Sequence, residues 1–259
     1  MMQSIFTRIK DLAMHARVSE SGAQASAHII VLVHGLAMSG RYMMPTAERL
    51  IDYARVYVPD LPGFGQSEKP PQALTVAELA DYLACWLDAM NITCAVFVGN
   101  SFGTQIIVEL AMRFPSRVGK AVLIAPTVDR HARSFSRQLM RLLLDATREP
   151  LSLTPLAVSD YFRTGIRRAA RTLRYAIADR IEEKLPRLSI PLLVVRGVRD
   201  PIVPQRWAEE TARLSTCARL VVLPQAAHAV NYSSPEELAR LVMSFANESS
   251  APDAEAFVV

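Results

Sequence analysis

The chain has 259 residues, of which 51% are hydrophobic and 21% are charged, and its formal net charge is +4. This balance provides enough apolar side chains for the core of one large α/β domain or two small ones, and it excludes a disordered chain. The positive charge is too small to indicate binding of nucleic acid. The sequence contains no run of about 18 apolar residues, which is the length that would indicate a membrane span.

The cysteines and the N-terminus indicate the compartment. Cys85, Cys94 and Cys217 are odd in number and lack C-x-x-C spacing, which is typical of free thiols in a reducing compartment. Charged residues interrupt the first 18 residues, so they contain no apolar core of a signal peptide. We therefore expect a soluble cytoplasmic protein with no membrane partner.

Apolar runs separated by turn residues predict strands that alternate with helices. Residues 1–20 predict one or two short antiparallel strands, and residues 21–27 predict a turn. Residues 28–33 are continuously apolar, which is typical of a strand buried on both faces. Thr75 and Glu78 form a capping-box pattern at the start of a helix that reaches about residue 90. The other strands are expected at 55–58, 95–98, 118–125, 191–195 and 219–223, and the other helices at 40–52 (capped by Ser39 or Gly40), 104–113, 204–214 and 235–246.

The alternation stops in the middle of the chain. Residues 127–187 show no strand pattern, and helices are expected there at 133–148, 154–163 and 167–184. Alternating strands and helices with apolar strands predict an α/β fold whose central sheet is mostly parallel, with about eight strands and helices on both faces. We expect a core domain of residues 1–126 and 188–247, an inserted helical cap of residues 127–187, and a flexible tail of residues 248–259.

The strongest motif lies where one strand meets the next helix. The apolar run 95–98 leads into Gly99-Asn-Ser-Phe-Gly103, and a helical run follows. The pattern G-x-S-x-G between a strand and a helix predicts a nucleophile elbow, with Ser101 at its apex. Small residues are needed at Gly99 and Gly103 because a Cβ atom there would collide with the neighbouring backbone. Backbone N–H groups at the start of the helix favour negative charge that develops beside the serine.

A serine nucleophile needs a base, and a histidine base needs an orienting acid. Asp200 and His228 each follow a predicted strand, at the edge of the sheet where ligands bind in open α/β folds. The chain order Ser101, Asp200, His228 is the order that accompanies this elbow. Asp129, which follows the strand after the elbow, is an alternative acid. No cluster has the spacing of metal ligands, so we expect neither a metal nor a cofactor.

These motifs resemble those of the α/β-hydrolase fold superfamily, in its capped, esterase-like form. The resemblance implies that Ser101 is the nucleophile, that His228 is the general base and acid, and that Asp200 orients the imidazole. It also implies an oxyanion hole made by the backbone N–H groups of Leu36 and Phe102. The resemblance covers about residues 28–246 and rests on Val33-His34-Gly35, on residues 59–67 (PDLPGFGQS), on the elbow, on residues 197–200 with Val203-Pro204, and on His228 with Pro235-Glu236.

The function implied by this resemblance is hydrolysis of a carboxylic ester, or a related acyl bond, of a small molecule through an acyl-enzyme on Ser101. Carbon–carbon bond hydrolases of ring-cleavage products share the Gly-Asn-Ser elbow and remain an alternative. They usually place a tryptophan after the catalytic histidine, where this chain has Ala229, and a glycine-rich oxyanion loop, where it has Leu36-Ala37-Met38. A receptor that keeps the triad but turns over slowly is another alternative. The same triad serves thioesters, lactones and amides, and the oligomeric state stays open.

The inserted segment, residues 127–187, carries thirteen basic and seven acidic residues, a net charge of +6. These basic side chains form either a solvated surface or an entrance that attracts acidic substrates. Six of its apolar residues are candidates to line an acyl pocket: Leu139, Leu142, Leu143, Leu156, Tyr161 and Phe162.

Overall fold

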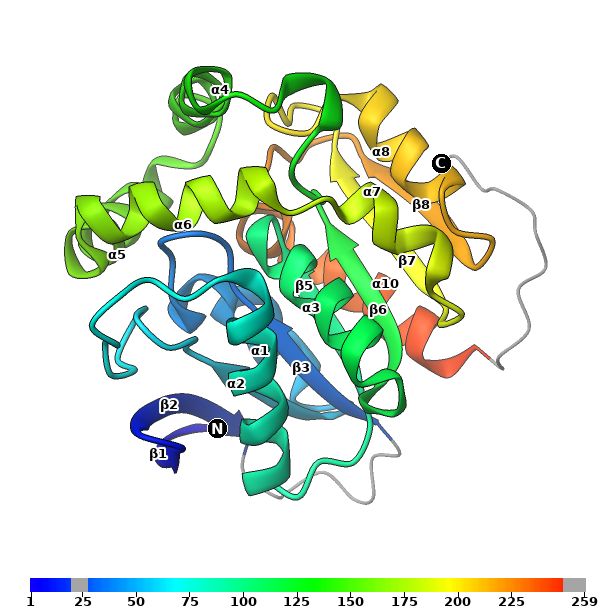
Figure 1. Ribbon diagram of the computed structural model, residues 1–259. Helices are drawn as coiled ribbons and strands as arrows, with labels where there is room; N and C mark the ends of the chain where they lie inside the picture. The colour runs from blue at the N-terminus through cyan, green and yellow to red at the C-terminus, as the bar shows by residue number, and fades with distance from the viewer. Residues whose placement is uncertain (20–27, 249–259) are drawn as a thin grey trace.

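The computed structural model describes residues 1–19 and 28–248 (Figure 1). The turn expected at residues 21–27 and the tail expected after residue 248 lie outside the described residues. Eight strands form one sheet, in the order β1-β2-β4-β3-β5-β6-β7-β8. They are β1 (Met2–Ile9), β2 (Leu12–Ser19), β3 (Ile29–Val33), β4 (Arg55–Pro59), β5 (Ala95–Asn100), β6 (Val118–Ile124), β7 (Leu192–Gly197) and β8 (Ala218–Leu223).

The sheet is mostly parallel, as the continuous apolar runs predict. Strands β3 to β8 pair in parallel, while β1 pairs antiparallel with β2, and β2 pairs antiparallel with β4. All six residues of β5 are buried, and so are four of the five residues of β3. Strands covered on both faces need apolar side chains on both faces, which explains why their sequences do not alternate.

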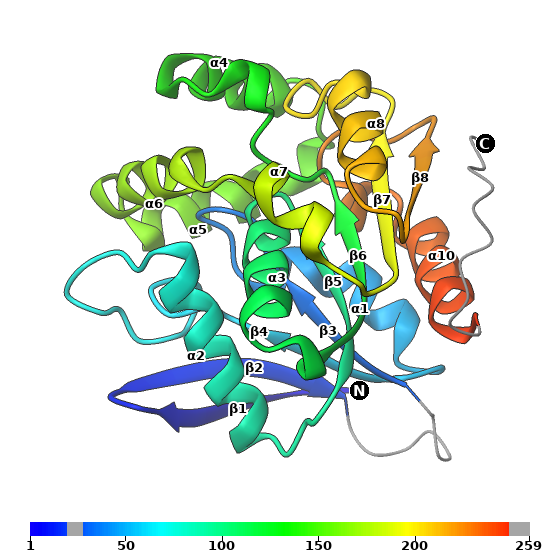
Figure 2. The ribbon, with the colours of Figure 1, turned by 45° about the vertical axis from the view of Figure 1, so that its right-hand side comes forward.

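Helices cover both faces of the sheet. Figures 1 and 2 show α2 and α3 on one face and α1 and α10 on the other. The predicted capping box is present at the start of α2, where Thr75 Oγ1 accepts from the Glu78 N–H and Glu78 Oε2 accepts from the Thr75 N–H, at 3.3 and 2.7 Å. The helices outside the inserted segment are α1 (Met44–Leu50), α2 (Val76–Ala89), α3 (Phe102–Arg113), α8 (Gln205–Arg213), α9 (Val230–Ser233) and α10 (Pro235–Asn247).

The helix expected at residues 40–52 differs in its first turn. The chain first forms a 3₁₀ turn, Gly40–Met43, and the α-helix begins only at Met44. Ser39 does not cap this turn with its side chain. Its hydroxyl instead donates to Asp160 Oδ2 at 2.6 Å, in a buried contact with the inserted segment. A tertiary hydrogen bond therefore takes the group that a local cap would have used.

The inserted segment lies between β6 and β7 and contains no strand, as expected. Its helices are α4 (Phe135–Ala146), α5 (Thr154–Thr164), α6 (Ile166–Ala178) and α7 (Ile181–Lys184). The arrows of β6 and β8 point toward the end of the molecule where α4, α5 and α6 lie (Figure 2). Helices α4 to α6 therefore lie beyond the carboxyl ends of the parallel strands, where ligands bind in such sheets.

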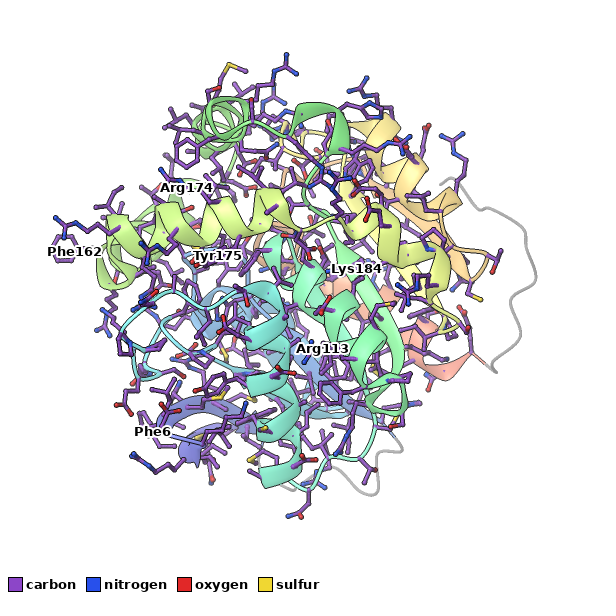
Figure 3. All side chains as sticks on the ribbon, viewed as in Figure 1. Phe6, Arg113, Phe162, Arg174, Tyr175 and Lys184 are labelled. Atoms are coloured by element: carbon purple, nitrogen blue, oxygen red, sulfur yellow. The ribbon has the colours of Figure 1, made fainter. Side chains whose placement is uncertain are left out.

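The single helix expected at residues 167–184 is instead divided, because α6 ends at Ala178 and α7 begins at Ile181. The Asp179 carboxylate between them accepts from Gln105 Nε2 of α3 at 3.1 Å and pairs with Lys184. Lys184 Nζ also lies 2.7 Å from Glu109 Oε2, and Figure 3 shows it beside α3. A hydrogen bond from Gln105 and an ion pair with Glu109, both residues of α3, thus hold the chain where the helical pattern alone would have continued.

Candidate active site

Ser101 occupies a strained turn between β5 and α3. Its backbone angles are φ 55° and ψ −118°, in a region that residues other than glycine rarely adopt. The Ser101 N–H donates to the Ile124 carbonyl at 2.8 Å, which anchors the turn to β6. A Cβ atom on Gly103 would lie 2.5 Å from the Val33 carbonyl oxygen, and one on Gly99 would lie 2.5 Å from Ile107 Cδ1. The two small residues of the motif are therefore required by packing.

Asp200 and His228 lie in the loops that follow β7 and β8, and they contact each other. Asp200 Oδ2 is 2.9 Å from His228 Nδ1, and both side chains are buried. Asp200 Oδ1 accepts from the N–H groups of Ile202 and Val203 at 2.7 and 2.9 Å. Because the carboxylate is held at both oxygens, Nδ1 of the imidazole carries the proton and Nε2 is left to act as a base.

Direct contacts join these two loops to the elbow. A Cβ atom on Gly197 would lie 2.2 Å from the Ala227 carbonyl oxygen, so the Asp200 loop and the His228 loop touch through backbone atoms. Asn100, the residue before the nucleophile, donates from Nδ2 to the His228 carbonyl at 3.0 Å. Contacts between these loops thus connect the elbow to Asp200 and His228, which lie 99 and 127 positions after Ser101 in the sequence.

Ser101 and His228 line the same cavity, whose volume is about 480 Å³. Of the six apolar residues expected in an acyl pocket, Leu139, Leu142, Leu143 and Tyr161 belong to its wall. Leu156 instead packs against the hydrophobic core, and Phe162 is 88% exposed and extends away from the molecule at the end of α5 (Figure 3). The wall is completed by Met38, Ala146, Leu153, Ala157 and Val158, among other residues.

The two backbone N–H groups expected to form an oxyanion hole are free to donate to a ligand. Within residues 1–19 and 28–248, neither Leu36 N–H nor Phe102 N–H donates to an acceptor of the protein. Phe102 is the first residue of α3, where helical N–H groups have no partner in the helix. Leu36 and Ser101 both line the cavity.

His34 braces the loop that carries Leu36. The Leu61 N–H donates to His34 Nε2 at 3.1 Å, so the proton is on Nδ1, which donates to the Gly35 carbonyl at 2.9 Å. Burial lowers the pKa of His34, which keeps the ring neutral and able to accept at Nε2.

Asp129, the alternative acid, has partners other than His228. Its Oδ2 pairs with Arg141 at 3.0 Å, and its Oδ1 accepts from the His131 N–H at 2.9 Å. Both contacts lie within the inserted segment. Asp200 is therefore the carboxylate that is hydrogen-bonded to His228.

The electrostatic surroundings favour a protonated His228. Burial by itself would lower the pKa of the imidazole, but the Asp200 carboxylate beside it, with Asp145 and Glu149 nearby, outweighs burial and raises the pKa to about 9. A general base must be neutral when it removes a proton, so the resting ring has to lose its proton first.

We therefore expect kcat/KM for an uncharged ester to rise with pH and to level off only above about pH 9. At neutral pH about one molecule in a hundred would carry the neutral imidazole. The measurement is kcat/KM from about pH 6 to about pH 10.5, since this quantity reports the free enzyme. Asp145→Asn should lower the apparent pKa by removing one of the carboxylates. A plateau already reached near pH 7 would contradict this assignment.

Neither a metal-binding cluster nor a membrane-spanning helix occurs among the described residues. No group of three or more His, Cys, Asp or Glu side chains within them is arranged to hold a metal ion. In that same part of the chain, no helix combines the length and the apolar character needed to cross a membrane.

Comparison with known proteins places the chain in a family. The model of the alpha/beta hydrolase family matches residues 30–241, which is most of the chain. The protein belongs to the alpha/beta hydrolase family. This membership confirms the resemblance seen in the motifs, as well as the α/β fold and the expectation of a hydrolase.

Curated relatives of this hydrolase include esterases. A pimeloyl-[acyl-carrier protein] methyl ester esterase of Vibrio vulnificus is 25% identical over 245 residues, which cover 85% of this chain and 94% of the relative. The enzyme of the same name from Vibrio campbellii is 27% identical over 243 residues, which cover 84% and 94% of the two chains.

Solved structures show the same fold. A hydrolase from Pseudomonas aeruginosa matches this one with a TM-score of 0.79 at 23% identity, over 95% of this chain and 98% of the other. An enol-lactonase from Burkholderia xenovorans also matches with a TM-score of 0.79 at 23% identity, over 94% of this chain and all of the other.

Sequence reasoning missed two acidic residues of this hydrolase's cavity. Asp145 of α4 and Glu149 just after it belong to the cavity wall beside His228. In the sequence they counted only toward the net charge of the inserted segment. Their spacing of four residues, which puts two side chains on one face of a helix, is the signal that could have singled them out.

Proposed function

We propose that this hydrolase cleaves carboxylic esters of small molecules through an acyl-enzyme on Ser101. The observation that carries the proposal is the Asp200–His228 hydrogen bond of 2.9 Å at the wall of a cavity that Ser101 also lines. We further propose that residues 1–126 and 188–247 form the core domain and that the inserted segment, residues 127–187, is a cap over this cavity.

Each step of the reaction uses a group at this site. Ser101 Oγ attacks the ester carbonyl carbon while His228 Nε2 takes the hydroxyl proton, and Asp200 stabilises the imidazolium that results. The N–H groups of Leu36 and Phe102 bind the oxyanion, and the loss of one such donor typically costs about 100- to 1000-fold in rate. His228 then protonates the departing alkoxide. Water, activated by the same ring, releases the acid and restores the serine.

The relatives support an ester as the bond cleaved. Two curated relatives are named as methyl ester esterases, and a structural neighbour is named as an enol-lactonase. Hydrolysis of an ester bond, open or cyclic, is common to these names. Ester hydrolysis is therefore the first activity to measure.

A fluorophosphonate probe should label Ser101 and no other residue, because only an activated serine attacks phosphorus readily. Labelling is located by mass spectrometry of the digested protein. In parallel, turnover is measured on a series of p-nitrophenyl esters with short and long acyl chains. Labelling of another residue would refute the assignment of the nucleophile.

The same experiment separates the alternatives. Labelling of Ser101 with steady turnover of the esters supports the esterase. Labelling with a single burst and no turnover would favour a slow, receptor-like protein. Labelling without any ester cleavage, together with hydrolysis of a vinylogous diketone, would favour the carbon–carbon bond hydrolase.

A further inference from the structure

Two acidic side chains of the cavity wall have oxygens without a partner. Asp145 is 8% exposed, and its Oδ1 has no hydrogen bond. Glu149 Oε1 accepts from the Ala229 N–H at 2.7 Å, next to His228, while its Oε2 is buried and has no hydrogen bond. Both residues line the cavity that contains Ser101. Buried acceptors of this kind are costly unless a donor reaches them.

No lysine or arginine of the described residues pairs with these two carboxyl groups, although the His228 imidazolium lies near both. Among the ion pairs of residues 1–19 and 28–248, none includes Asp145 or Glu149. The nearby arginines are engaged elsewhere, since Arg141 pairs with Asp129 and Arg148 donates to the Arg199 carbonyl. Burial raises the pKa of Asp145 to about 6 and that of Glu149 to about 7. The Asp200 carboxylate adds to both shifts and Asp145 adds to that of Glu149, while His228 opposes both.

The rest of the wall near the inserted segment is mostly apolar. Helices α4 and α5 contribute leucine, alanine and valine side chains to it, and Thr154 and Tyr161 are their other polar residues there. No group of the described residues donates to the two open oxygens, so a ligand can supply the donor. We propose that Asp145 and Glu149 form a subsite that binds a protonated amino group of the substrate, while the ester carbonyl lies at Ser101. The position of an ester carbonyl at Ser101 depends on the function proposed above. The binding of the amino group can be tested without turnover.

This inference bears against one of the two alternatives left open for the basic inserted segment, namely that it attracts acidic substrates. None of its thirteen basic residues, all within the described part of the chain, belongs to the wall of the Ser101 cavity. Four of its arginines line a separate groove with Lys69, between α6 and the loop before α2: Arg167, Arg168, Arg171 and Arg174. The charge beside the nucleophile is negative, so a carboxylate on the substrate should be disfavoured there and an ammonium group favoured.

The test measures binding to the Ser101→Ala protein, which cannot turn over an ester. Three ligands of one chain length, n-hexylammonium, hexan-1-ol and hexanoate, are titrated by calorimetry at about pH 8. Most of the acids are then ionised and the amine is protonated. The ammonium ion should bind about 10- to 100-fold more tightly than the alcohol, the range expected for a hydrogen bond to a charged group, and hexanoate should bind most weakly. Equal affinities, no binding of the ammonium ion, or a preference for hexanoate would overturn the proposal.

Variants assign the preference to the two acids. Asp145→Asn with Glu149→Gln, in the Ser101→Ala background, should remove the preference for the ammonium ion. Glu183→Gln is the matched control, because Glu183 is an exposed acid of the same segment that pairs with Arg180. Retention of the preference in the double variant would refute the role of these residues. If the double variant does not fold, the comparison of the three ligands on the Ser101→Ala protein still decides whether the subsite exists.

Kinetics separate this proposal from the proposed function. The p-nitrophenyl ester of 6-aminohexanoate should have a kcat/KM about 10- to 100-fold higher than that of the hexanoate ester. Hydrolysis of both esters at the same rate would refute the subsite and leave the esterase standing. Tight binding of hexylammonium without hydrolysis of either ester would support the subsite and refute the esterase.

Discussion

Replacement of Ser101 by alanine is expected to lower kcat for a p-nitrophenyl ester by about a million-fold, the loss seen when the serine of another catalytic triad is removed. The reason is that the reaction then has no nucleophile, and the oxyanion hole and the binding cavity alone supply the remaining catalysis. The fold should be unaffected, because the backbone N–H and C=O of Ser101 hold the turn. Steady-state kinetics and the Tm are the measurements.

Ser116→Ala is the matched control, since Ser116 is exposed in the 3₁₀ turn between α3 and β6. Its substitution should change neither kcat nor Tm. Comparable turnover in the Ser101→Ala protein would show that another residue is the nucleophile. A large loss of Tm would instead mean that the Ser101 hydroxyl stabilises the fold.

Asp200→Asn is expected to lower kcat by about 10,000-fold, as the corresponding change does in a serine protease. The N–H groups of Ile202 and Val203 donate to one oxygen of the side chain. An asparagine would keep its single oxygen there and turn its NH₂ group toward His228 Nδ1. That nitrogen would then have to accept, so the proton would move to Nε2 and the ring could not act as a base.

Asp129→Asn is the comparison that tests the choice of acid. This carboxylate pairs with Arg141 inside the inserted segment, so its loss should lower Tm and change kcat by only a few-fold. Kinetics of both variants at one pH, with thermal denaturation of each, distinguish the two roles. If Asp129→Asn lost more activity than Asp200→Asn, the orienting acid would have to be reassigned.

The sheet, the turn at Ser101 and the contact between Asp200 and His228 could be predicted because they depend on local patterns. Continuous apolar runs predicted strands covered on both faces, and the structure contains these strands. A tight turn between a strand and a helix requires Gly103, whose Cβ atom would otherwise collide with the backbone of β3. Asp200 and His228 each follow an apolar run, and parallel strands end at one edge of the sheet, so their meeting followed from the topology.

Contacts between distant segments were decided by the tertiary structure alone. Ser39 gives its hydroxyl to Asp160, 121 residues away, although its position favoured a helix cap. The helical pattern through residue 184 is interrupted where Asp179 reaches Gln105 of α3. Asp145 and Glu149 belong to the active-site cavity only because folding buries them beside His228, while the arginines of the same segment lie outside it. Backbone sterics and the period of apolar residues act over a few consecutive positions, whereas the free energy of a buried charge depends on neighbours in space that no local pattern records.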